Sequence, residues 1–109
     1  MKTVESLNQK LNTQEFTHQI ITDEMGNKAF IGVAFKNDPD NTTFTLYYGR
    51  SKMLCEFYKT VNSEGVLTTH MLSQQRLNAA EFKKLETRIV MDKFLKSSTI
   101  VNGIEMFEI

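Results

Sequence analysis

The chain has 109 residues, 40% of them hydrophobic, and its 13 basic side chains balance 13 acidic ones. That length is too short for two ordinary domains, so we expect a single domain over residues 1–109. A neutral chain lacks the overall field that attracts nucleic acid or an anionic membrane, and a single cysteine excludes an intramolecular disulfide. Since no apolar run resembles a signal peptide or a membrane span, we expect a soluble cytoplasmic protein without a membrane partner.

The first elements expected along the chain are a short N-terminal helix and a β-meander. Val4, Leu7 and Leu11 recur at helical spacing and would form one apolar stripe. After them the pattern changes to β-rich runs separated by turn residues, which is typical of antiparallel strands. The expected strands cover about residues 16–23, 28–36, 43–48, 52–61 and 66–72.

A longer helix is expected near residues 79–96. Asn78 and Glu81 have the spacing of a capping box, in which each side chain bonds a backbone amide at the start of a helix. Beyond the helix, Asn102-Gly103 separates two apolar runs, which predicts a C-terminal β-hairpin or one added strand. The predicted fold class is therefore α+β, with an antiparallel meander of about five strands between the two helices.

Strand alternation divides the meander into two faces. Met53, Cys55 and Phe57 are assigned to the core face, so Cys55 is expected to be buried and unreactive. The second face is too apolar for a fully exposed sheet surface, and we expect a terminal element, a second copy of the chain or a bound partner to cover it. The candidate binding residues on this second face are Phe30, Tyr47, Leu54 and Tyr58.

No pattern in the sequence predicts catalysis. The two histidines, His18 and His70, have no second ligand at metal-binding spacing. Asp38 and Asp40 predict a turn and not a calcium loop, because the required glycine and bidentate glutamate are missing. Glycine-rich phosphate loops and nucleophile elbows are absent as well. We therefore expect no catalytic residue, no metal and no cofactor.

Aromatic and basic residues crowd one window of the third and fourth strands. Single-stranded nucleic acids bind such mixtures, because rings stack on bases while cations contact phosphates. The RNA-recognition signature is absent, however, and Glu56 lies between the candidate rings. The residues of this alternative are Tyr47, Tyr48, Arg50, Lys52, Tyr58 and Lys59.

The interpretation that the sequence favours is a small non-enzymatic protein that binds another macromolecule, a protein in preference to a nucleic acid. Abundant Asn, Thr, Lys and Met with a single proline would also suit an accessory or inhibitory protein of a phage or mobile element. A single-stranded nucleic-acid-binding protein is the first alternative. A small enzyme whose site is shared between subunits is the second, and a homo-oligomer is compatible with all three.

Overall fold

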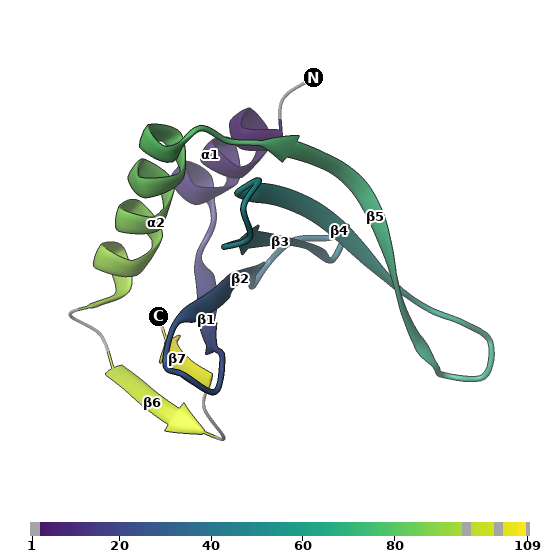
Figure 1. Ribbon diagram of the computed structural model, residues 1–109. Coiled ribbons are helices and arrows are strands. Elements are labelled where there is room, and N and C mark those ends of the chain that lie inside the picture. The colour runs from purple at the N-terminus through teal and green to yellow at the C-terminus, as the bar shows by residue number, and fades with distance from the viewer. Residues whose placement is uncertain (1–2, 95–96, 102–103, 109) are drawn as a thin grey trace.

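Two helices and one antiparallel sheet make up the computed structural model, which describes residues 3–94, 97–101 and 104–108, with side chains for residues 3–91. The sheet has the strand order β5-β4-β3-β2-β1-β7-β6 (Figure 1). This confirms the predicted α+β meander with its short and longer helices. The elements are α1 (Thr3–Thr13), β1 (Phe16–Thr22), β2 (Lys28–Phe35), β3 (Thr42–Tyr47), β4 (Met53–Val61), β5 (Leu67–Arg76), α2 (Ala79–Phe94), β6 (Ser97–Val101) and β7 (Ile104–Glu108).

Both helices lie on the same side of the sheet (Figure 1). α1 contacts β4 and β5, while α2 contacts β1 and the C-terminal strands. The apolar stripes of both helices meet the strands there and exclude water, which is the main stabilising contribution in a domain of this size. The buried core consists of Leu7, Leu11, Phe16, Ile20, Ile31, Val33, Phe35, Phe44, Leu46, Leu54, Leu77, Phe82, Leu85 and Ile89.

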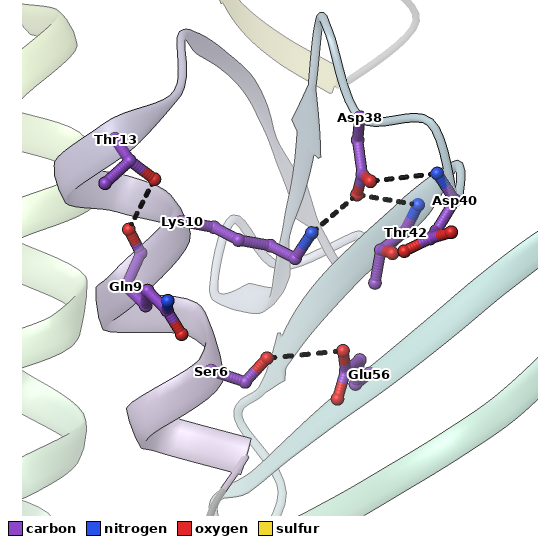
Figure 2. Close-up of polar contacts among 8 residues, drawn as sticks. All are labelled: Ser6, Gln9, Lys10, Thr13, Asp38, Asp40, Thr42 and Glu56. Carbon is purple, nitrogen blue, oxygen red and sulfur yellow. Dashed lines mark hydrogen bonds and ion pairs between the residues drawn. The ribbon is translucent and has the colours of Figure 1, made fainter.

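An ion pair fixes α1 to the turn between β2 and β3 (Figure 2). One oxygen of the Asp38 carboxylate accepts hydrogen bonds from Lys10 Nζ at 2.9 Å and the Thr42 amide at 3.0 Å. The other oxygen accepts from the Asp40 amide at 3.0 Å. Burial alone would raise the pKa of Asp38, but Lys10 and the two amides outweigh burial and lower it.

A second polar contact joins the start of α1 to β4 and β5. The Glu56 carboxylate is buried and accepts hydrogen bonds from Ser73 Oγ at 2.8 Å and Ser6 Oγ at 3.4 Å. Thr3 Oγ1 donates in turn to Ser73 Oγ at 3.0 Å. A carboxylate is tolerated at this depth because neighbouring hydroxyl groups replace its water.

The position of Glu56 corrects the predicted faces of β4. In the observed register Leu54 pairs with Leu46 of β3, so Leu54 and Glu56 point toward the helices. Cys55 pairs with Thr45 and points the other way, where it is half-buried. The assignment of Met53, Cys55 and Phe57 to the core was therefore wrong, and so was the expectation that Cys55 is fully buried.

The connection between β3 and β4 determines which side chains of β4 face the helices. Lys52 has a φ of 42°, in the left-handed region that non-glycine residues seldom adopt, and its amide donates to Gly49 O at 3.0 Å. The Lys52 carbonyl accepts from the Leu77 amide at 2.9 Å, which fixes the turn against the chain leading into α2. Both alternating sets on β4 contain apolar residues, so hydropathy alone could not decide which set faces inward.

β5 extends four residues beyond the expected end at residue 72, to Arg76. The register with β4 shifts between Glu56 and Phe57, which leaves Leu72 as the extra residue of a bulge. Bulges bend a strand and increase its twist. In Figure 1 the β4–β5 hairpin accordingly curves and projects away from the helices.

The C-terminal strands extend the sheet beside β1. β7 pairs with β1 and with β6, both antiparallel. The Asn102-Gly103 turn that we expected between them lies outside the described residues. In the described part of the chain, the terminal elements thus cover the core face or lengthen the sheet, and none lies over the second face.

Candidate binding face

The side of β1–β4 that points away from the helices is the candidate site, and we call it the open face. Its members alternate with the core residues along each strand and pair with one another across the sheet. Most are half-buried, and Gln19 and Tyr47 are exposed. The open face consists of Thr17, Gln19, Ile21, Phe30, Gly32, Ala34, Thr43, Thr45, Tyr47, Met53, Cys55, Phe57 and Lys59.

A polar hollow of about 360 Å³ lies over β1, β2 and β3. Gly32 forms part of its floor, and a Cβ added there would have no heavy atom within 4 Å. Thr17, Thr43 and Thr45 supply hydroxyl groups around it, and Lys59 supplies a cation. Glycine in a strand interior weakens the strand, so its presence here is consistent with a site at which another molecule approaches the backbone.

An apolar hollow of about 440 Å³ adjoins the polar one and shares Phe30 and Thr45 with it. Met53, Cys55 and Phe57 of β4 form its other wall. These are the residues that the sequence analysis placed in the core. Burial raises the pKa of the Cys55 thiol, so near neutral pH this group is an apolar wall atom and a poor nucleophile.

Tyr47 borders the apolar hollow and is 51% exposed. Its ring lies over Gly49, where an added Cβ would come within 2.3 Å of a ring carbon. Gly49 therefore permits the ring to lie along the chain. A large, exposed aromatic ring suits a contact residue, because it offers much contact area for few rotatable bonds.

The apolar surface continues from the open face onto the β4–β5 hairpin. Phe57 pairs with Met71 across the two strands, and Val61 pairs with Leu67 nearer the tip. The hairpin carries five large apolar side chains that are each more than half exposed: Val61, Val66, Leu67, Met71 and Leu72.

The predicted binding residues do not all reach this surface. Phe30 and Tyr47 do, and they pair directly with each other. Leu54 is fully buried in the core, so its assignment to the second face was wrong. Tyr58 lies on the helix side of β4, where its ring stacks on His70 with centroids 4.9 Å apart.

The residues of the nucleic-acid alternative are divided between the two faces. Tyr47 and Lys59 lie on the open face. Tyr48 packs edge-on against Phe82 of α2, with centroids 4.7 Å apart, and Lys52 Nζ lies 4.9 Å from the centre of the same ring. Tyr58 is also on the helix side, and Arg50 is in the turn before β4. The window therefore does not form one platform.

Met53, Phe57 and Lys59 belong to the open face, but the sequence analysis did not assign them to a protein-binding site. The signal that could have found them was Gly32, because a mid-strand glycine between apolar residues indicates open space above the backbone. Recognising the strand neighbours of Gly32 requires the register, which the sequence does not specify.

Residues that could hold a metal do not gather in the described part of the chain: no three His, Cys, Asp or Glu side chains lie close enough together there. Neither of the described helices combines the length and apolar composition needed to cross a membrane. In comparisons with known proteins, no family model, no curated protein and no solved structure matches the chain.

Proposed function

We propose that this chain is a non-enzymatic protein that works by binding another protein on its open face. The observation that supports the proposal is the pair of adjoining hollows on a sheet face that the described elements leave uncovered. Of the three covers expected for this face, the internal one is not supplied by any described element, because both helices pack on the opposite side and the C-terminal strands lengthen the sheet.

The composition of the face suits a protein contact. Aromatic residues and methionine are enriched at the centres of protein interfaces, and Phe30, Tyr47, Met53 and Phe57 line one hollow. Val61, Leu67 and Met71 of the β4–β5 hairpin enlarge this apolar area toward one edge of the sheet. Apolar surface of this extent on a sheet face is typical of an interaction site.

An accessory or inhibitory role suits such a protein, because it would act by occupying its partner. As part of the same proposal we place the protein in the cytoplasm, where its one free thiol would stay reduced. The nucleic-acid alternative gains no support, since five of its six residues are divided between two faces and Arg50 is in a turn.

Filling the polar hollow tests the proposal without disturbing the core. Gly32→Leu places a side chain in open space, whereas Gly32→Ala makes the same backbone change but leaves most of the hollow free. Both variants should be at least as stable as the wild type, because glycine destabilises a strand interior by roughly 0.5–1 kcal/mol relative to alanine.

The measurement is affinity capture from host cells with quantitative mass spectrometry. We expect a protein partner that the wild type and Gly32→Ala retain and that Gly32→Leu loses. Met91→Glu changes an exposed residue on α2, the helix side, and should retain the partner. Capture that is equal for all four proteins, or that is lost only with Met91→Glu, would show that the open face is not the site.

A further inference from the structure

Lys59 has no ion-pair partner among the described residues, although it lines the polar hollow and is only half exposed. The ion pairs of the described chain lie on the helix side, where Lys10 meets Asp38 and Glu86 meets two other lysines. Lys59 therefore lines the hollow without a neutralising group from the described part of its own chain.

Among the side chains that the structure describes on the open face, none is a carboxylate. Within β1–β5 the single acidic residue is Glu56, and its side chain points toward α1. Lys59 and Arg76 are on the open side of β4 and β5, since Arg76 pairs with Met53. On the open side of β1–β5, a chain that is neutral overall thus presents basic charge and no acidic charge.

The two hollows are close enough for one short segment to fill both. Phe30 and Gly32 are two residues apart on β2, which separates them by roughly 6.5–7 Å along the strand. Side chains at i and i+2 of an extended peptide have the same separation, and those at i and i+4 of a helix are about 5–6 Å apart.

Resting on the proposed function, we infer that the partner segment is both acidic and apolar: a carboxylate enters the polar hollow beside Lys59, and a large apolar side chain fills the hollow between Phe30 and Phe57. Complementary charge of this kind selects partners and orients them, while the apolar side chain supplies most of the affinity. A nucleic acid fits less well, because it needs several phosphate contacts and stacked rings, whereas the face offers two cations.

The test is selection of a random twelve-residue peptide library displayed on phage against the purified full-length protein. We expect the wild type to enrich peptides with Asp or Glu two to four positions from Phe, Leu or Met. Lys59→Glu should reverse the preference, enriching Lys or Arg at the acidic position. If Lys59→Glu does not fold, Lys59→Gln must still lose the enrichment of acidic residues.

Synthetic peptides from the selection give the magnitude. Lys59→Glu should weaken the binding of an acidic peptide about three- to tenfold, because it removes one partly exposed ion pair and adds repulsion between like charges. Lys84→Glu makes the same charge change on an exposed residue of α2 and should leave the affinity unchanged. Gly32→Leu should abolish binding.

The contrary outcomes separate the inference from the proposed function. The selected peptides could depend on the open face, failing to bind Gly32→Leu, without being enriched in Asp or Glu. That result would overturn the inference and leave the proposed binding face intact. If no peptide is enriched, or if Gly32→Leu binds the same peptides as the wild type, both fail. Binding of a fifteen-nucleotide oligothymidylate that is tighter than any selected peptide and lost in Lys59→Glu would overturn both in favour of nucleic acid.

Discussion

The two faces of β3 and β4 differ in how their polar groups are satisfied. On the covered face, Phe44, Leu46 and Leu54 are fully buried, and the one carboxylate among them, Glu56, accepts hydrogen bonds from neighbouring hydroxyls. On the open face, apolar rings border unfilled space, and the ammonium of Lys59 has no partner among the described residues. The same strands thus have one face on which the side chains are fully packed and another face with space for a second molecule.

The largest expected effect is a difference in stability between substitutions on the two faces of β4. Leu54→Ala should lower the free energy of unfolding by about 2–5 kcal/mol, because it leaves a cavity among fully buried neighbours. Met53→Ala removes a half-exposed side chain from the open face and should cost less than about 1.5 kcal/mol. Urea unfolding of both variants measures the difference. If Met53→Ala lowers the free energy of unfolding as much as Leu54→Ala does, then Met53, and not Leu54, faces the core.

The next effect concerns the ion pair that holds α1 against the covered face. Asp38→Ala should cost about 1.5–3 kcal/mol near neutral pH, the usual range for hydrogen bonds to a charged group. Because folding lowers the pKa of Asp38, its contribution is present above the ordinary value of 3.8 and is lost as the pH falls through the lower folded value.

Urea unfolding of the wild type and Asp38→Ala at a series of pH values tests this sign. The difference between them should shrink as the solution becomes more acidic than pH 3.8. Asp40→Ala alters an exposed carboxylate in the same turn and should have little effect at any pH. A difference that stays constant through the acid range would mean that the Asp38 charge does not stabilise the fold.

The smallest effect concerns the start of the helix that covers β1. The Asn78 side chain accepts from the Glu81 amide at 2.8 Å, and the Glu81 side chain accepts from the Asn78 amide at 3.2 Å. Asn78→Ala should cost about 1 kcal/mol, whereas Asn78→Asp and Asn78→Ser should be nearly neutral because both side chains can cap. Thermal unfolding compares the three. Equal losses would show that the cap does not stabilise α2.

Local features of the fold could be predicted because they depend on neighbours in the sequence. The capping box at Asn78 fixed the start of α2, and the turns at Gly26 and Gly65 have the positive φ values that glycine favours, 83° and 82°. On β2, Ile31 and Val33 alternate with the smaller Gly32 and Ala34, and the larger pair does face the core. In each case a few adjacent residues contain all the information that is needed.

The residues of the open face were predicted only in part. Phe30 and Tyr47 were assigned to the correct surface, but Leu54 and Tyr58 were not, because the sequence analysis placed β4 in the wrong phase. Because of the same error, Met53 and Phe57, which line the apolar hollow, were not assigned to this face. A shift of one residue moves every side chain of a strand to the other face, so one wrong phase placed two of the four candidate residues on the wrong face.

The sequence by itself determined where the helices and strands of the meander lie and which side chains alternate along each strand. Tertiary structure decided which face the helices cover, and hence which face stays open. The physical reason is that both faces of β4 are apolar enough to be buried, so local hydropathy leaves them nearly equivalent. The left-handed turn at Lys52 and the hydroxyl groups that donate to Glu56 select which face of β4 is buried. These hydrogen bonds involve residues as far apart in sequence as Ser6 and Ser73.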